Sequence, residues 1–240
     1  MCSVIHLEQL NQAYGKEVVL KDIQLQINKG EIYGLLGPSG SGKTTLVKAI
    51  IGGLTPISGL IQVDAVQMPN LKKLNDIGYM AQADALYDEL TANENLAFFA
   101  KLYRMQGSYR KRRITEVLQQ VGLLSDKHKR VEHFSGGMKR RLSLAIALLH
   151  EPKILILDEP TVGIDPVLRN QIWNSFEQLK KAGVAVVITT HVMDEAERCD
   201  RLGLLRNGSI LASGTPNALK EQAGVATIEE AFLHLGSVQS

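Results

Sequence analysis

"GPSGSGKTT", residues 37–45, is the stretch that decides the fold of this chain. It matches the pattern G-x-x-x-x-G-K-[ST] from Gly37 to Thr44. The apolar stretch "IYGLL" (32–36) precedes it, and a helical stretch from 45 to 51 follows it. Glycines let the backbone wrap around a phosphate with its N–H groups turned inward, and the next helix N-terminus adds partial positive charge. An accidental glycine-rich turn is the alternative, but the flanking strand and helix favour a phosphate-binding loop.

The loop predicts a set of nucleotide-binding residues. The Lys43 side chain is long enough to reach the β- and γ-phosphates, and the Thr44 hydroxyl is a suitable ligand for Mg²⁺. The set comprises Gly37, Pro38, Ser39, Gly40, Ser41, Gly42, Lys43, Thr44 and Thr45.

Two further apolar runs, "ILIL" (154–157) and "VAVVITT" (184–190), are typical of parallel strands buried on both faces. The N-terminal part differs, because Ile23, Leu25 and Ile27 alternate with glutamines and so predict antiparallel sheet with one solvated face. The predicted fold class is therefore α/β. It has a phosphate-loop NTPase core with a mostly parallel sheet and an antiparallel N-terminal β-subdomain.

Helices are predicted between the phosphate loop and the second apolar run. Thr91 and Glu94 have the spacing of a capping box, which opens a helix expected to extend through about Met105. Apolar residues then recur with helical spacing over 114–121, and Gly122 ends that helix.

These patterns predict one domain spanning 1–240. Residues 1–84 and 151–240 would form its core, and an inserted α-helical lobe would occupy about 85–150 because no Pro/Gly/Ser-rich linker separates the parts. A hairpin is expected at 206–209 and a second capping box at 227–230.

Carboxylates and a histidine follow the two later apolar runs. "ILILDEP" (154–160) places Asp158 and Glu159 just past a strand whose carboxyl end should face the ligand crevice. Asp158 suits Mg²⁺ and Glu159 suits activation of a water molecule, whereas the alternative is a solvated acidic loop. His191 directly follows the last run and could reach the γ-phosphate; a packing or surface histidine is the alternative.

Composition further limits the classes of protein to which the chain could belong. The net charge of +2 is too small to argue for nucleic acid. Cys2 and Cys199 have neither metal-site nor redox spacing, which favours a reducing compartment. No secretory signal is visible, and the longest apolar run of about eight residues is far below the roughly 20 of a membrane span. We expect a soluble protein, which does not exclude a membrane-embedded partner.

The stretch "HFSGGMKRRL" (133–142) sets Lys139, Arg140 and Arg141 at the start of a predicted helix, where the helix dipole disfavours cations. Ser135 can cap that helix, and the glycines allow close backbone approach. For the three cations we favour a solvated or lobe-facing basic edge over direct phosphate contacts.

With "FSGGM" (134–138) beside the phosphate loop, "ILILDEP" and His191, the chain resembles the nucleotide-binding subunit of an ATP-binding cassette (ABC) transporter over nearly its whole length. The resemblance implies a cytoplasmic ATPase, peripheral on the membrane, that uses ATP and Mg²⁺. It also implies a second ATPase subunit, a homodimer partner or a paralogue, and separate transmembrane permease subunits. No nucleic acid is expected as a partner.

The resemblance also implies roles for several residues whose function physical reasoning alone does not decide. Tyr14 would stack on adenine. Gln82, in "YMAQ" (79–82), would lie near Mg²⁺ and the attacking water. Asp165 would reach the partner subunit and also cap a helix. Ser135, Gly136 and Gly137 would bind the γ-phosphate held by the partner subunit.

Two positions depart from the family pattern: Met138 stands where glutamine is common, and Ala81 where proline is frequent. Neither removes a phosphate ligand, so we expect hydrolysis. "SGGMKRRL", "TVGIDP" and "TIEEAFLHL" look most like ATPases of ABC-2-type exporters, including drug and antibiotic efflux systems. The alternatives are a soluble cassette ATPase of DNA repair or translation and a nucleotide-binding regulator without turnover.

Overall fold

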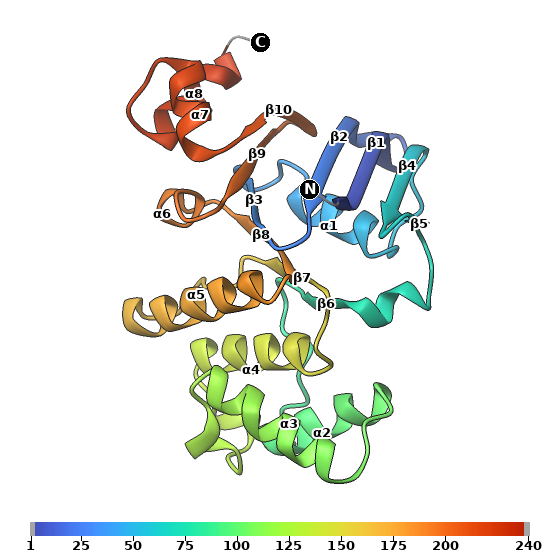
Figure 1. Ribbon diagram of the computed structural model, residues 1–240, viewed down its shortest axis with the longest axis vertical. Coiled ribbons are helices and arrows are strands. Elements are labelled where there is room, and N and C mark those ends of the chain that lie inside the picture. Colours follow the sequence, from blue (N-terminus) through green and yellow to red (C-terminus); the bar gives the residue numbers. More distant parts are fainter. Residues whose placement is uncertain (1–2, 238–240) are drawn as a thin grey trace.

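The computed structural model describes residues 3–237. Cys2 and the outermost residues of the expected core, 1–2 and 238–240, lie outside the described residues. Two sheets and the helices around them make up the structure (Figure 1). The four-stranded sheet has the order β2-β1-β4-β5. Its strands are β1 (Ser3–Tyr14), β2 (Glu17–Asn28), β4 (Ser58–Val63) and β5 (Val66–Gln67).

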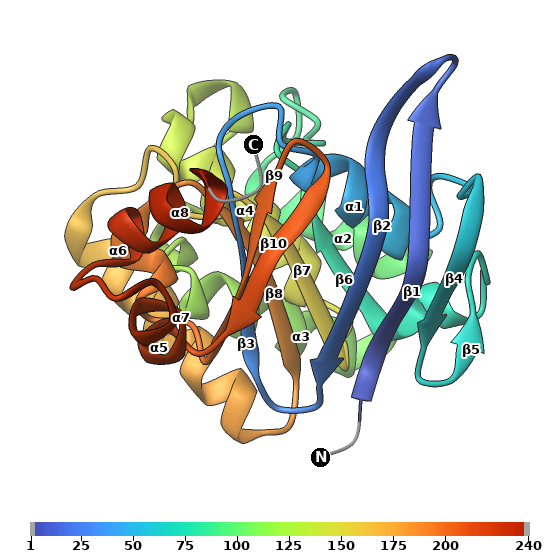
Figure 2. The ribbon, with the colours of Figure 1, turned by 90° about the horizontal axis from the view of Figure 1, so that it is seen from above.

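The four-stranded sheet is antiparallel in each of its strand pairs, as the alternating sequence predicts. Ile23, Leu25 and Ile27 of β2 are buried, while Gln24 and Gln26 between them are exposed. This sheet stands beside the larger one when the molecule is seen from above (Figure 2). One face of β1, β2 and β4 therefore contributes to the core, whereas both residues of β5 are exposed.

The six-stranded sheet has the order β10-β9-β3-β8-β7-β6 and is parallel except for the β9/β10 pair. All residues of β3, β7 and β8 are buried, as their continuous apolar sequences predict. The strands are β3 (Ile32–Leu36), β6 (Ile77–Met80), β7 (Ile154–Asp158), β8 (Ala185–Thr190), β9 (Arg201–Arg206) and β10 (Ser209–Gly214). The carboxyl ends of the parallel strands meet at one edge of this sheet, which is where α/β sheets bind ligands.

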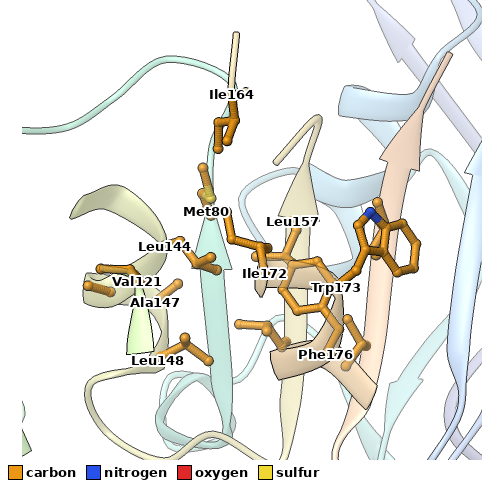
Figure 3. Packing of buried hydrophobic residues seen from close by; sticks show 14 of the residues in the cluster. Met80, Val121, Leu144, Ala147, Leu148, Leu157, Ile164, Ile172, Trp173 and Phe176 are labelled. Atoms are coloured by element: carbon orange, nitrogen blue, oxygen red, sulfur yellow. The ribbon is translucent and has the colours of Figure 1, made fainter. Parts of the chain in front are cut away.

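Successive residues of β7 point into two different hydrophobic clusters. Ile154 and Ile156 contact the cluster that includes helix α1 (Lys43–Ile50) and the four-stranded sheet. Leu155 and Leu157 contact the cluster that includes α4 (Gly136–Leu148) and α5 (Pro166–Lys181). Figure 3 shows the second cluster, with Trp173 of α5 beside the sheet. Burial on both faces fixes the strand that carries the acidic residues.

Helices α2 (Ala92–Leu102), α3 (Gly107–Gln120) and α4 lie together at the lower end of Figure 1. The capping box of Thr91 and Glu94 is confirmed, since the Glu94 N–H donates to Oγ1 of Thr91 at 3.2 Å. Helix α2 ends earlier than about Met105, because Arg104 adopts a left-handed φ of 57°. The division into a lobe at 85–150 and a core on either side stays a prediction.

Near the end of the described residues, a hairpin is followed by two short helices. Asn207 and Gly208 turn β9 into β10 with φ values of 50° and 82°, which confirms the predicted hairpin. The capping box at 227–230 is also confirmed, with the Glu230 N–H donating to Oγ1 of Thr227 at 3.2 Å. The remaining helices are α6 (Met193–Ala196), α7 (Pro216–Ala223), α8 (Ile228–Ser237) and the 3₁₀ turns Lys73–Asp76, Leu124–Asp126 and Val131–His133. Among residues 3–237, no helix has the length and apolar character that crossing a membrane requires.

Candidate functional site: the nucleotide cleft and the signature surface

The loop between β3 and α1 depends on glycine. Gly40 and Gly42 have φ values of 79° and 107°, in the region that side chains disfavour. A Cβ atom on Gly42 would come within 2.8 Å of Cδ2 of Leu20. The loop can therefore keep its wrapped shape, with helix α1 beginning directly after it, only if glycine occupies this position.

Lys43 turns back over this loop. Its Nζ donates hydrogen bonds to the carbonyl oxygens of Gly37 at 2.7 Å and Pro38 at 2.9 Å, and the residue is buried. Burial lowers the pKa of Lys43, and the carboxylates of Glu159 and Asp158 oppose that shift. The ammonium group is thus held at the loop with acceptors that phosphate oxygens could replace.

A hydrogen bond between Thr44 and Asp158 joins α1 to β7. Oγ1 of Thr44 donates to Oδ2 of Asp158 at 2.8 Å, and Asp158 is fully buried. Oδ1 of Asp158 accepts a hydrogen bond from the Thr189 hydroxyl of β8. Hydroxyl and carboxylate oxygens are the hard ligands that Mg²⁺ prefers, and it commonly uses one or two protein ligands together with substrate phosphates. No group of three or more His, Cys, Asp or Glu suited to a metal occurs in the described part of the chain.

The carboxylate of Glu159 lies between two other predicted residues. Nδ1 of His191 is 3.1 Å from its Oε1, and Nε2 of Gln82 is 3.5 Å from its Oε2. The Glu159 backbone has a left-handed φ of 53°, and its N–H is held by both oxygens of Thr189, at 3.1 and 3.0 Å. The structure thus brings together the three residues predicted to be catalytic, which follow three different strands.

Gln82 and Glu159 line a cavity of about 310 Å³ together with residues of the phosphate loop, whereas His191 lines a separate cavity with Gly37, Pro38 and Ser39. Tyr14, from the end of β1, is half exposed at 49% and lines the cavity of about 310 Å³. An aromatic ring there could stack on a base whose phosphates lie in the loop. The lining residues are Tyr14, Val19, Ser39, Gly40, Gly42, Lys43, Thr44, Thr45, Gln82 and Glu159.

The glycine-rich stretch at the start of α4 lines a second cavity of about 600 Å³. Ser135 caps α4, with its Oγ accepting the N–H of Met138 at 3.3 Å. Space at Gly137 is limited, because a Cβ atom there would lie 3.1 Å from the carbonyl oxygen of Gly163. Asp165 is on the same cavity and caps α5 through hydrogen bonds from the N–H groups of Val167 and Leu168.

Gln82 and Glu159 line both cavities. Ser135, Gly136, Gly137 and Asp165 line the second but not the first, whereas Lys43 and Thr44 line the first but not the second. Within one chain, the structure therefore does not bring the signature residues to the phosphate loop. The two sets lie on either side of the Glu159 carboxylate.

The three cations after the signature have separate partners. Lys139 pairs with Asp88 at 2.8 Å, and Arg141 donates to the carbonyl oxygens of Val121 and Gly122, so both face the lobe as expected. For Arg140 the expectation of a solvated or lobe-facing edge is wrong. Its guanidinium is buried and donates to the backbone carbonyl oxygens of Ala81 and Glu159.

Two functional features escaped the sequence reasoning. One is Arg140, whose spacing to Leu144 and Ala147 (i+4 and i+7) places it on the buried stripe of the helix and could have revealed it. The other is Thr189, whose hydroxyl joins Asp158 to the backbone of Glu159. A threonine inside an apolar strand gives no comparable signal.

Known proteins are similar to this chain in sequence. The family described as "ABC transporter" matches residues 20–162. The linearmycin resistance ATP-binding protein LnrL of Bacillus subtilis (strain 168) is 42% identical, with 96% of this chain and 78% of that protein aligned. The Nod factor export ATP-binding protein I of Rhizobium johnstonii is 42% identical, with 94% and 74% aligned.

Solved structures show the same fold. The ATP-binding cassette MJ0796, in a dimeric post-hydrolysis state bound to ADP and Pi, superposes with a TM-score of 0.80 and 29% sequence identity. The match covers 88% of this chain and 98% of that one. Together with the family match and the two relatives, this establishes the family that the motifs indicate. The chain belongs to the ABC transporter family and is an ATP-binding, ATP-hydrolysing subunit of that family.

Proposed function

We propose that the ATP hydrolysis of this chain drives export through separate permease subunits of the ABC-2 type. The observation that carries the catalytic part is the convergence of Gln82 and His191 on the Glu159 carboxylate beside the phosphate loop. Export is supported by the names of two relatives, one a linearmycin resistance protein and the other a Nod factor export protein.

The positions of the residues support the following roles. Lys43 and the loop amides hold the β- and γ-phosphates, and Tyr14 stacks on adenine. Thr44, Asp158 and Gln82 are the residues that would hold Mg²⁺, which neutralises phosphate charge when bound. Glu159 orients and deprotonates the attacking water, and His191 contacts the γ-phosphate.

We propose that two such subunits pack head to tail, with ATP bound between the phosphate loop of one chain and the signature of the other. The separation of Ser135 and Lys43 into different cavities supports this arrangement, because neither cavity alone holds the full set. The dimeric state of the cassette MJ0796 also supports it. Such a pair is a two-fold assembly, and ATP would favour it by binding the closed state more tightly.

The permease would dock on the helical lobe at the cytoplasmic face of the membrane. Phe98 and Leu102 of α2, together with Tyr87, expose apolar surface there, with exposed fractions of 37%, 63% and 44%. The rings of Tyr87 and Phe98 pack edge to face at 4.8 Å. These exposed apolar side chains support the proposal that this part of the lobe binds a partner.

Co-purification of partners from detergent-solubilised membranes tests this function. The tagged chain should retain a polytopic membrane protein, and the double variant Phe98→Glu, Leu102→Glu should lose it while keeping ATPase activity. Leu233→Glu is the matched control, because Leu233 is 60% exposed on α8 at the opposite end of the molecule (Figure 1). Retention of ribosomes or DNA in place of a membrane protein would contradict the proposal and favour the soluble ATPase class.

A further inference from the structure

The guanidinium of Arg140 joins three segments of the chain. Nη1 donates to the carbonyl oxygens of Ala81 at 2.7 Å and Gln82 at 2.9 Å. Nη2 donates to the carbonyl oxygen of Glu159 at 2.8 Å and to that of Asp158. Arg140 itself belongs to α4 and is 7% exposed.

Two of these acceptors belong to residues proposed to act on the bound nucleotide. Gln82 follows β6 without being part of any helix or strand, and Glu159 has a left-handed φ of 53°. Neither backbone is therefore fixed by regular structure, although each side chain must face the other across 3.5 Å. One planar guanidinium that holds both carbonyl groups fixes their separation.

Arg140 is also rigidly linked to the signature. Ser135 caps the helix in which Arg140 lies, and five residues of α-helix advance about 7.5 Å. A displacement of the N-terminus of α4 consequently moves the guanidinium as well. The N-terminus and Arg140 both line the second cavity, while Gln82 and Glu159, whose carbonyl oxygens the guanidinium binds, line both cavities.

We propose that Arg140 is a positioning residue that couples the signature end of α4 to the geometry of Gln82 and Glu159 in the same chain. This inference rests on the proposed function, in which the signature contacts ATP bound to the partner subunit. Binding at one nucleotide site would then be transmitted along α4 to the Gln82 and Glu159 that serve the other site.

The contacts require arginine rather than a generic cation. The planar guanidinium of Arg140 has five acceptors: four backbone carbonyl oxygens and Oδ1 of Asp84, which is 3.5 Å away. A lysine ammonium has only three N–H donors and lacks the planar arrangement, so it cannot make the same set of hydrogen bonds. Burial lowers the pKa of Arg140, and Asp84 acts most strongly against that shift. Asp84 is itself held by the Ser143 hydroxyl at 2.7 Å, one turn further along α4.

Arg141 is a matched control on the same helix. Its Nη1 donates to the carbonyl oxygens of Val121 and Gly122 at 3.0 and 2.9 Å, at the end of α3. It thus links two lobe helices through backbone contacts of the same chemical type, with none to Gln82 or Glu159. Comparing Arg140→Lys with Arg141→Lys separates positioning from a general loss of arginine contacts.

The test combines hydrogen exchange with kinetics on the full chain. Arg140→Lys should speed amide exchange in segments 79–86 and 157–162 and leave 119–124 unchanged, whereas Arg141→Lys should do the reverse. For ATP turnover, Arg140→Lys should lower kcat by at least about tenfold and leave KM within about twofold, because nucleotide contacts persist. Its Hill coefficient for ATP should fall to about 1 from a wild-type value above 1.

The outcomes are distinct. The proposal would be overturned if Arg140→Lys resembled Arg141→Lys in ATP turnover, cooperativity and amide exchange. It would also be overturned if Arg140→Lys had a lowered kcat but kept the wild-type Hill coefficient. If wild-type protein neither dimerises with ATP nor hydrolyses it cooperatively, the proposed function fails instead. The exchange pattern in nucleotide-free protein still decides whether Arg140 positions the two segments.

Discussion

Nδ1 of His191 lies 3.1 Å from Oε1 of Glu159, although the two residues follow different strands of the parallel sheet. Strands β7 and β8 are neighbours, so their carboxyl ends place both side chains at the same edge. The hydroxyl of Thr189, two residues before His191, also accepts a hydrogen bond from the N–H of Glu159. The carboxylate is therefore oriented through both its side chain and its backbone.

Glu159→Gln should slow ATP hydrolysis at least about 100-fold, because the amide cannot take a proton from water. ATP binding should persist, since Lys43 and the loop amides are unchanged. The variant should accumulate as a dimer with ATP, measured by size-exclusion chromatography with light scattering.

The control for this variant is Glu229→Gln, which changes an exposed carboxylate on α8. It should retain wild-type phosphate release. Wild-type turnover in Glu159→Gln would remove Glu159 from its assigned role, and an absence of turnover in the wild type would favour a regulator without hydrolysis.

Glu195 stabilises the edge of the sheet at which β7 and β8 end. Its buried carboxylate accepts hydrogen bonds from the hydroxyls of Thr190, at 2.7 Å, and Thr161. Glu195→Ala should lower the free energy of unfolding by about 1–3 kcal/mol, because two buried hydroxyls lose their acceptor. Urea denaturation measures this change.

Glu197→Ala is the comparison for that measurement. Glu197 is exposed and pairs with Lys220 at 3.0 Å, so its loss should cost under about 1 kcal/mol. Equal costs for the two variants would contradict a structural role for the Glu195 network.

His150 makes stability depend on pH. Burial lowers its pKa, its ring stacks on Tyr103 at 4.0 Å, and its Nε2 lies 3.1 Å from the Ile77 carbonyl oxygen. Because the folded pKa is below the unfolded one, the unfolded chain takes up the proton first as pH falls. The associated stability is present above the unfolded pKa and is lost as pH falls through the folded pKa.

The free energy of unfolding should therefore decrease between about pH 7 and 5, by at most about 1.4 kcal/mol per pH unit from this residue. His150→Phe keeps an aromatic ring and should flatten that slope. Urea denaturation at several pH values checks it, and parallel slopes for wild type and variant would refute the assignment to His150.

The parts of the fold that local chemistry dictates could be predicted from the sequence. The phosphate loop, the buried strands, the capping boxes of Thr91 and Thr227 and the hairpin at 206–209 each depend on residues within a few positions of one another. The convergence of Gln82, Glu159 and His191 followed from strand ends meeting at one sheet edge together with the family resemblance.

The predictions that the structure corrects concern features that depend on contacts between distant segments. Arg140 looked like part of a basic edge, since nothing local shows that four carbonyl oxygens from 81–82 and 158–159 surround it. Helix α2 also ends before the predicted boundary at about Met105. Arg104 adopts a left-handed φ although the surrounding sequence permits helix. Sheet order could not be obtained either, as β3 pairs with β8 and β9 from the far end of the chain.

In the proposed dimer, two chains together complete each ATP site. Mixing Ser135→Arg with Lys43→Ala tests this arrangement most directly, because the first variant keeps its phosphate loop and the second keeps its signature. Each variant alone should release almost no phosphate, Ser135→Arg should bind ATP like the wild-type monomer, and the mixture should hydrolyse ATP well above the sum of the two. Absence of recovery in the mixture, or lost ATP affinity in the Ser135→Arg monomer, would contradict a site shared between chains.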